Sequence, residues 1–147
     1  MGRLQMDKRS LMRFAKKMRD LDHAALDGAA EGLEDVAKIA MDMSQEQVPV
    51  GSGTLKNSKY IEDPKIEKWQ RRVSIKLGYG GKADKRHPKT GQMASEYMVY
   101  VHEDLKAHHP TGKAKFLEDP IMEIPSELGP KIAVGVKNRF ARVAIKR

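Results

Sequence analysis

Three histidines and two carboxylates form the densest group of potential ligands in the sequence. They are His102, Glu103, Asp104, His108 and His109. Imidazole and carboxylate groups bind zinc and related metals, so a metal site has to be considered. Neighbouring histidines in a loop rarely direct their rings at one ion, however, and no HExxH or similar helical spacing is present. We therefore predict no metal ligand here and expect His108 and His109 to be contact residues of a loop.

The glycine-rich segments lack the pattern of a phosphate-binding loop. Gly112-Lys113 is followed by Ala114, no glycine stands five residues earlier, and residues 51–53 and 78–80 are isolated turns. The chain has no cysteine, which excludes disulfides, thiolate zinc sites and a cysteine nucleophile. No other nucleophile can be matched with a base and an orienting group. We predict no catalytic residue, no cofactor and no enzymatic activity.

Composition and charge narrow the class of protein. The 147 residues are 39% hydrophobic, 5% aromatic and 33% charged, which indicates one domain over residues 1–147 with a modest core. No segment approaches the apolar length of a membrane span, and no signal-peptide core follows the basic N-terminus, so we expect no membrane contact. The net charge is +8, and residues 51–147 hold 20 basic against 11 acidic side chains. Such an excess suits either nucleic acid or an acidic protein surface.

A long amphipathic helix is the clearest predicted element. We expect a frayed lead over residues 1–9 and a helix capped by Ser10 that ends near Gln47. Gly28 and Gly32 lie inside it, and we prefer tolerated weak spots to a close approach of another backbone. Apolar side chains recur every three or four residues at Leu11, Phe14, Met18, Leu21, Ala25, Ala29, Leu33, Val36, Ala40 and Met43.

The charges on this helix are segregated along its length. Basic residues crowd the first turns, where they oppose the helix dipole, so stability alone does not explain them. Arg13, Lys16 and Lys17 are therefore candidates for an interface with an acidic partner, the alternative being a plain solvated face. Five acidic residues follow in the middle of the helix: Asp22, Asp27, Glu31, Glu34 and Asp35.

The centre of the chain is predicted to be extended. Pro49 ends the helix, a tight loop leads to Leu55, and strands are expected over residues 58–62 and 70–77 with a turn at Asp63-Pro64. Trp69, at the start of the second strand, is interpreted as a rim or packing residue rather than a ligand platform. The apolar run from Tyr97 through Tyr100 to Val101 predicts a buried third strand. Between them, residues 82–92 are expected to form a flexible basic loop, with the interface candidates Lys82, Lys85, Arg86 and Lys89.

The last third is predicted to return to helix. After a polar excursion over residues 105–115, which includes the interface candidate Lys113, Phe116 and Leu117 should anchor the chain to the core. Asp119-Pro120 is expected to start a short helix near residues 120–124, followed by a second helix capped by Ser126 with Pro130 in its first turn. Residues 132–136 could instead form a strand. The expected inward face is Ile132, Val136, Phe140 and Val143, and the expected basic end is Arg139, Arg142, Lys146 and Arg147.

Three segments of the chain carry a family resemblance. The first is the loop Pro49-Val50-Gly51-Ser52-Gly53-Thr54-Leu55-Lys56-Asn57-Ser58, the second ends Tyr97-Met98-Val99-Tyr100-Val101-His102-Glu103, and the third is Lys115-Phe116-Leu117-Glu118-Asp119-Pro120. With the long first helix, this order resembles the neck or tail-completion proteins of tailed bacteriophages, also called head-tail joining or minor capsid proteins. In that family the loop reads Pro-Val-Asp-Thr-Gly-x-Leu-x-x-Ser. Here Gly51-Ser52 replaces Asp-Thr, His102 precedes Glu103, and two prolines interrupt the last helix.

The resemblance implies both a fold and a role. The implied fold is α+β, a small antiparallel sheet packed against the long N-terminal helix and a C-terminal helix. The implied role is structural: a ring, with six copies favoured over twelve, that joins the portal and head-closure proteins to the tail within the virion. Pro49, Leu55, Tyr97, Tyr100, Phe116 and Leu117 would be structural anchors, and the acidic and basic parts of neighbouring subunits would meet. A small basic nucleic-acid-binding protein is the alternative, and contact with packaged DNA stays open.

Overall fold

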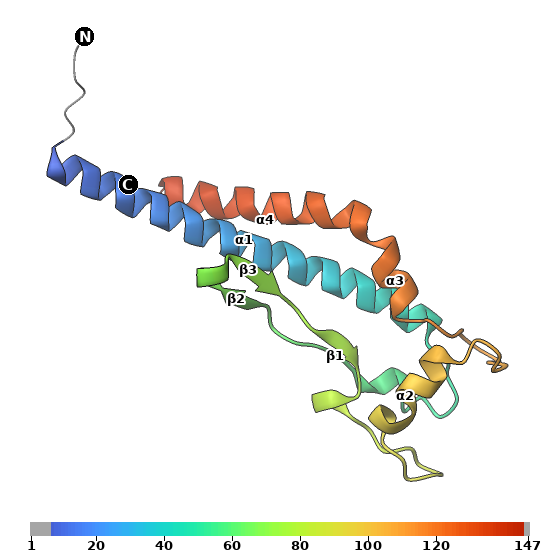
Figure 1. The fold of residues 1–147 in the computed structure, drawn as a ribbon. Coiled ribbons are helices and arrows are strands. Elements are labelled where there is room, and N and C mark those ends of the chain that lie inside the picture. The colour runs from blue at the N-terminus through green and yellow to red at the C-terminus, as the bar shows by residue number, and fades with distance from the viewer. Residues whose placement is uncertain (1–6, 146–147) are drawn as a thin grey trace.

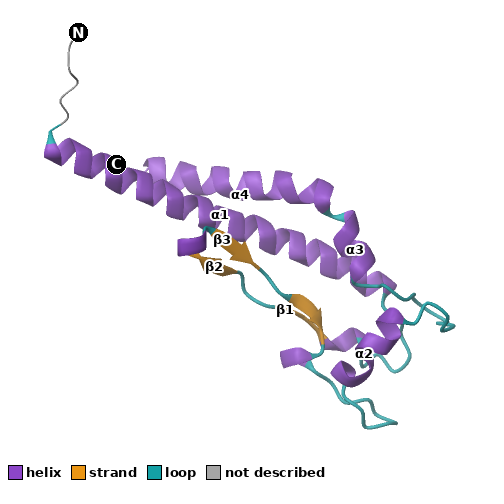
Figure 2. Ribbon diagram, viewed as in Figure 1, coloured by secondary structure: helices purple, strands orange, loops and turns teal. Residues whose placement is uncertain are grey.

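A computed structural model describes residues 7–145, and its fold is α+β as predicted, 62% helix and 10% strand. Helix α1 (Lys8–Gln47) runs through the whole molecule. In Figures 1 and 2, α4 lies along one side of α1, the strands lie on the other side, and α2 lies near its C-terminal end. None of the helices over residues 7–145 is long and apolar enough to cross a membrane.

The first helix confirms the prediction from apolar spacing but starts earlier. Asp7, not Ser10, is the N-cap residue, and its carboxylate accepts the Arg9 and Ser10 amide groups at 2.8 and 3.0 Å. The Ser10 hydroxyl also donates to this carboxylate at 2.7 Å. These hydrogen bonds favour the ionised carboxylate and lower the pKa of Asp7, the Ser10 hydroxyl most strongly. Of the predicted frayed lead, residues 1–6 lie outside the described chain, whereas Lys8 and Arg9 are helical.

Two helices close the chain, in agreement with the predicted break between them. They are α3 (Glu118–Glu123) and α4 (Pro125–Ile145), and the alternative strand over residues 132–136 is wrong. The predicted caps are also wrong. Leu117 precedes α3, so Asp119 lies inside the helix. Helix α4 begins at Pro125 rather than after Ser126, because a proline in the first position loses no intrahelical hydrogen bond.

Helices α1 and α4 pack with their backbones in contact. A Cβ atom added to Gly28 would lie 2.5 Å from the Val136 Cα, and one added to Gly32 would lie 2.6 Å from the Ile132 Cα. On the other side, a Cβ atom added to Gly135 would lie 2.0 Å from the Gly28 carbonyl oxygen. The glycines therefore mark a close approach, and the preferred interpretation as weak spots is wrong. Of the expected inward face of α4, Ile132, Val136 and Val143 are half-buried, but Phe140 is exposed.

The strands form one long interrupted ribbon. Strand β1 (Lys59–Ile61) pairs antiparallel with β4 (Leu77–Tyr79), and β2 (Lys65–Glu67) pairs antiparallel with β3 (Arg72–Ser74). The chain reverses at Lys68–Gln70, where Arg71 adopts a left-handed conformation with φ 48°. The predicted turn at Asp63-Pro64 is therefore wrong: it lies between β1 and β2, where Pro64 has no amide to donate to a ladder. Trp69 lies at the tip of the ribbon rather than at the start of a strand.

The predicted strand over residues 97–101 is a helix, α2 (Ala94–Glu103). The Glu96 carboxylate accepts the Met93 amide at 2.9 Å and stabilises the first turn. Ala94 is buried, and Tyr97, Met98 and Val101 pack against the same core. Their spacing of three, four and seven residues from Ala94 is that of one helical face. Five consecutive apolar residues, Tyr97 to Val101, concealed this spacing in the sequence.

The main core lies where α1, the ribbon, α2 and the segment before α3 meet. Phe116 is fully buried, and its ring meets the Tyr79 ring edge-on at 5.4 Å between centroids. The Tyr79 hydroxyl lies 2.8 Å from the Ser44 hydroxyl and accepts from Gln45 Nε2 at 3.0 Å. Burial raises the pKa of Tyr79, so this hydroxyl is kept neutral. The core consists of Met41, Val48, Leu55, Tyr79, Ala94 and Phe116.

Candidate functional site

The predicted anchors lie in three different environments. Leu55 and Phe116 are buried in the core. Tyr97 and Leu117 are half-buried against this core, and Pro49 is half-buried in the loop after α1. Tyr100, by contrast, is 76% exposed on the outer face of α2 and does not anchor the fold. The inward stripe of this helix runs through Ala94, Tyr97, Met98 and Val101. At about 100° per residue, Tyr100 lies roughly 110° around the helix from the centre of that stripe, beyond Tyr97 at its edge.

The polar excursion after α2 folds back onto the end of α1. The Lys113 amide donates to the Gln47 carbonyl at 2.9 Å, and the Thr111 hydroxyl bonds the Val50 amide and carbonyl at 3.3 and 3.2 Å. Gly112 has φ 82°, and an added Cβ atom would lie 2.5 Å from the Gln47 carbonyl oxygen. Residues 104–108 remain exposed between these fixed points. The excursion is thus attached at its base and presents its tip to solvent.

His108 and His109 have different surroundings. His108 is exposed, whereas His109 is half-buried, and its Nε2 atom is enclosed without a hydrogen-bond partner in the described part of the chain. His109 lines a pocket of about 200 Å³ with Pro49, Leu55 and Tyr97. This pocket brings together the first and second segments of the family resemblance. His109 Nε2 is therefore a buried polar atom without a hydrogen-bond partner among the described residues, beside this pocket.

A different histidine belongs to a cluster of charged groups. His102, Glu103 and Glu118 place potential ligand atoms within 4.8 Å of one another. The Lys115 ammonium lies among them, 2.5 Å from Glu103 Oε2 and 2.8 Å from Glu118 Oε2. Lys115 lowers the pKa of Glu103, and Glu103 and Glu118 raise the pKa of Lys115. The cluster is therefore organised around an ammonium group, which takes the place that a metal ion would need.

His102 connects this cluster to the core. Its Nε2 atom accepts the Glu118 amide at 3.3 Å, which leaves Nδ1 to donate to Glu103 Oε1 at 2.7 Å. Its ring meets the Phe116 ring edge-on at 5.0 Å between centroids. The sequence grouped His102 with His108 and His109, but the fold instead brings it to residues that follow the excursion. This ring links α2 to the start of α3.

The basic loop over residues 82–92 has more internal structure than its composition predicted. Arg86 pairs with Met93 in an isolated bridge, and Arg86 Nη1 donates to the Gly91 carbonyl at 2.6 Å. His87 Nδ1 accepts the Lys89 and Thr90 amides at 3.2 and 3.1 Å. The Lys82, Lys85, Arg86 and Lys89 side chains are exposed, and none has an ion-pair partner among residues 7–145. The loop presents four cations from a small hydrogen-bonded hairpin.

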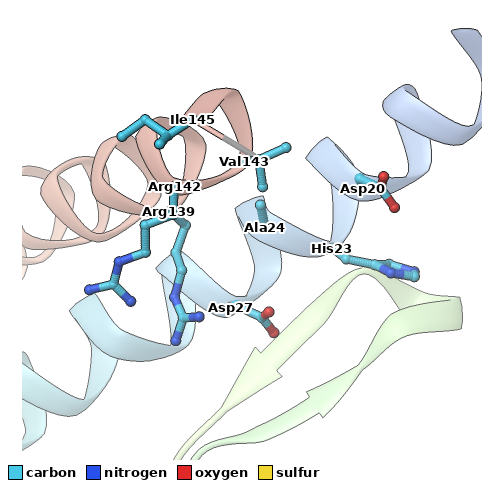
Figure 3. A pocket seen from close by; sticks show the side chains of 8 residues that line it. All are labelled: Asp20, His23, Ala24, Asp27, Arg139, Arg142, Val143 and Ile145. Atoms are coloured by element: carbon cyan, nitrogen blue, oxygen red, sulfur yellow. The ribbon is translucent and has the colours of Figure 1, made fainter. Parts of the chain in front are cut away.

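The end of α4 forms an open pocket of about 780 Å³ with α1 (Figure 3). In Figure 3 the Arg139 and Arg142 side chains extend from α4 toward α1 near Asp27. Arg139 Nη2 donates to Glu31 Oε1 at 2.5 Å, an interaction that raises the pKa of Arg139, and Arg142 lies 3.9 Å from the same carboxylate. Two cations of the predicted basic end thus pair within the chain, while Lys146 and Arg147 lie outside the described residues.

Beyond this pocket, α1 continues without cover. We call residues 8–20 the projecting end, and every residue in it is exposed. Leu11, Phe14 and Met18 are 53%, 58% and 49% exposed although they belong to the predicted inward stripe. Arg13, Lys16 and Lys17 lie here. This exposure was not predicted. Within the described residues, the 21 residues of α4 are too few to cover the 40 residues of α1.

The ribbon tip is a second exposed apolar feature that the sequence did not reveal. Trp69 is fully exposed there. Arg71 lies 3.4 Å from Asp22 of α1, and Arg72 Nε donates to Glu67 at 2.7 Å. Two of the adjacent cations are therefore engaged within the chain.

Comparison of the chain with protein-family models, with curated proteins and with solved structures finds no match. The features of the chain that can contact other molecules are its exposed surfaces: the projecting end, the ribbon tip, the basic loop and the excursion with its pocket.

Proposed function

We propose that this protein is a structural component of the head-tail connector of a tailed bacteriophage. In this proposal it forms a ring that joins the portal and head-closure proteins to the tail, and it acts without catalysis. It would be assembled in the cytoplasm of the bacterial host and then remain in the neck of the virion. The three segments of family resemblance are the basis for this choice of system.

The observation that carries the proposal is the projecting end. About three and a half helical turns place large apolar side chains in water on a helix whose remaining length is packed. Apolar side chains repeated on one face of a helix normally face another protein element. Here no such element is found among residues 7–145. A subunit that completes its packing in an assembly accounts for this arrangement.

Native mass spectrometry tests the assembly directly. The purified protein should form a closed ring, or remain a monomer that closes only when neck partners are added, with six copies favoured over twelve. A stable symmetric dimer as the sole species, both alone and with connector proteins, would contradict the proposal.

The excursion offers a second test. Replacing His108 and His109 together with serine should leave the melting temperature unchanged, because one side chain is exposed and the other makes no hydrogen bond among the described residues. Incorporation into necks should decrease. If this double variant unfolds, the excursion is not an assembly element. The same follows if reduced incorporation into necks is accompanied by the loss of a stoichiometric bound metal.

Binding of nucleic acid is the second candidate, and the exposed cations of residues 82–92 favour it. It predicts that the affinity of the monomer for DNA falls steeply with salt concentration, because each neutralised phosphate releases counterions. Reversal of Lys85 and Lys89 to glutamate should reduce that slope. Ring formation with DNA binding that is weak and insensitive to these changes would favour the connector.

The small hydrogen-bonded hairpin of the same loop is expected to be stabilised further by contact. Its exposed polar residues contribute little to the core, so its amide hydrogens should exchange rapidly in the free subunit and slowly after assembly. Equal and strong protection in both states would contradict a contact role for the loop.

A further inference from the structure

The projecting end needs a partner with a particular charge. Within residues 8–20 the only acidic residue is Asp20, whereas the basic ones are Lys8, Arg9, Arg13, Lys16, Lys17 and Arg19. Pairing two projecting ends would therefore bring two strongly basic helices together, and like charges at an interface oppose binding. The face that completes this helix must be both apolar and acidic.

Position on the helix identifies the cations that border the apolar stripe. Successive residues of a helix are rotated by about 100°, so Lys17 and Arg19 lie on either side of Met18. Lys16 lies on the opposite side of the helix from Leu11 and Met18. Of the predicted interface candidates on α1, Lys17 is thus placed beside the stripe, whereas Arg13 and Lys16 lie toward the far face.

The acidic middle of α1 is largely engaged inside its own subunit. Glu31 pairs with Arg139 and lies near Arg142. Glu34 pairs with Lys38 at 2.7 Å, and Asp22 lies 3.4 Å from Arg71. The expected use of this acidic middle by a neighbouring subunit is therefore weakened, because its carboxylates would have to give up existing partners.

Another surface of the same chain has the required character. We define the α3 surface as the exposed side of residues 118–127, which contain four acidic residues and no lysine or arginine. Ile121 and Met122 are 44% and 72% exposed there. Glu123 and Glu127 are exposed and have no ion-pair partner in the described part of the chain. Large apolar side chains are thus bordered by uncompensated carboxylates.

The two surfaces lie toward opposite ends of α1. Ile124, which follows α3, packs on Val36 and Ala40, and Phe14 lies about 36 Å away at 1.5 Å per helical residue. Figure 1 shows α3 near the C-terminal end of α1 and the projecting end beyond the end of α4. One rigid subunit cannot bring these surfaces together. Two copies arranged head to tail can place the projecting end of one against the α3 surface of the other.

We propose that the projecting end of one subunit docks on the α3 surface of the next copy, with Leu11, Phe14 and Met18 against Ile121 and Met122. Lys17 and Arg19 then face Glu123 and Glu127. This contact joins two different patches, so repeating it closes a ring when the rotation between subunits permits. The inference rests on the proposed ring and specifies its subunit contact.

Cysteine cross-linking of the full-length chain tests the contact, because the native sequence has no cysteine. Phe14→Cys and Met122→Cys are prepared as separate variants, mixed and oxidised. The expected product is the mixed dimer, in about tenfold excess over either homodimer. A mixture of Trp69→Cys with Met122→Cys is the control for random collision. Absence of the mixed product, or a dominant Phe14→Cys homodimer, overturns the proposal.

Charge reversal tests the specificity of docking. Lys17→Glu with Arg19→Glu should reduce the mixed cross-link about tenfold, and Glu123→Lys with Glu127→Lys in the partner should restore it. Arg13→Glu with Lys16→Glu makes the same charge change on the far face and should reduce it much less. If both reversals act equally, or if the compensating pair restores nothing, the assigned contact is wrong.

A chain that carries both cysteines separates this inference from the proposed function. Its oxidation should give a ladder of covalent oligomers that ends at the size of the closed ring. A ladder without an end would retain the head-to-tail contact but contradict the ring. A closed ring in native mass spectrometry with no ladder would retain the ring but overturn the contact.

Discussion

Residues 21–47 and residues 8–20 of α1 share one apolar spacing but have different surroundings. In the first region Gly28 is buried against α4, Val36 packs with Ile124 and Met41 belongs to the main core, whereas every residue of the second is exposed. The comparison shows what periodicity can predict. Apolar periodicity predicts that the segment is helical and which face packs against another element. It does not predict whether that element belongs to the same chain.

The part of the packed region that faces α4 also differs from the projecting end in the size of its apolar side chains. The packed region faces α4 with small residues such as Ala24, Gly28 and Gly32, which let the two backbones touch. The projecting end instead carries Leu11, Phe14 and Met18. Large side chains pack against elements whose axes lie farther away. Small side chains therefore mark the close contact with α4, whereas the larger side chains of the projecting end suit an element whose axis lies farther away.

The largest difference between the two regions is expected from the same substitution at two phenylalanines. Phe116→Ala should lower the free energy of unfolding by about 3 to 5 kcal/mol, because it leaves a cavity in the core. Phe14→Ala should leave the stability of the dilute monomer nearly unchanged, because this ring is 58% exposed. Denaturant unfolding of both variants measures the contrast. Equal losses would mean that the projecting end is packed within the subunit.

The glycine contact should give the next largest effect. Gly135→Ala places a methyl group against the Gly28 carbonyl and should cost about 1 to 3 kcal/mol or more, since the helices must separate. Thermal unfolding followed by circular dichroism measures this loss.

Gly129→Ala is the matched control on the same helix. Nothing lies within 4 Å of a Cβ atom added there. Any cost should come from Pro130, which disfavours helical backbone in the preceding residue, and should be smaller. If both alanine variants lose the same stability, the contact between α1 and α4 is looser than the structure indicates.

These contrasts show how far sequence reasoning reached. The first helix, the division of the last third into two helices and the buried position of Phe116 followed from apolar spacing, proline positions and residue type. The antiparallel pairing was expected only from the family resemblance. Helix α2 did not, because its run from Tyr97 to Val101 contains both inward and outward residues without a polar residue to mark the period. The reversal at Arg71 was also hidden, because nothing but the fold requires an arginine with positive φ.

Amino-acid composition indicated which segments carry exposed charges, but residue spacing did not indicate where those charges lie in the fold. Charge counts drew attention to basic residues on the first helix and in residues 82–92; these side chains are exposed, and their role as an interface stays a prediction. The ion pairs within the chain could not be predicted from the sequence, because partners such as Glu31 and Arg139 are more than a hundred residues apart. The acidic and apolar α3 surface was also missed, since Asp119-Pro120 was interpreted only as a helix start.

A smaller effect is expected from the buried hydroxyl network at the packed end of α1. Tyr79→Phe removes the partner of Ser44, which is fully buried, and should cost about 1 to 3 kcal/mol. Tyr100→Phe is the control, because that side chain is exposed and makes no hydrogen bond among the described residues. Chemical unfolding should separate the two variants. A neutral Tyr79→Phe would indicate that water or a repositioned Gln45 satisfies Ser44.

The smallest effect should come from the ion pair between Glu103 and Lys115, because Glu103 is more than half exposed and solvent screens the pair. The folded-state pKa of Glu103 lies below its ordinary value of 4.5, chiefly because of Lys115. The pair therefore stabilises the fold above pH 4.5, and this contribution is lost as the pH falls through the lower folded-state pKa. Lys115 has a pKa raised above 10.5, so the contribution is also lost as the pH rises through that higher value.

Subtracting the unfolding free energy of Glu103→Gln from that of the native protein should give a small positive difference at neutral pH that disappears at both extremes. Glu46→Gln, at an exposed position with no ion pair among residues 7–145, should show no such profile. A difference that persists in acid would mean that hydrogen bonds to His102, rather than the charge of Lys115, connect the end of α2 to the start of α3.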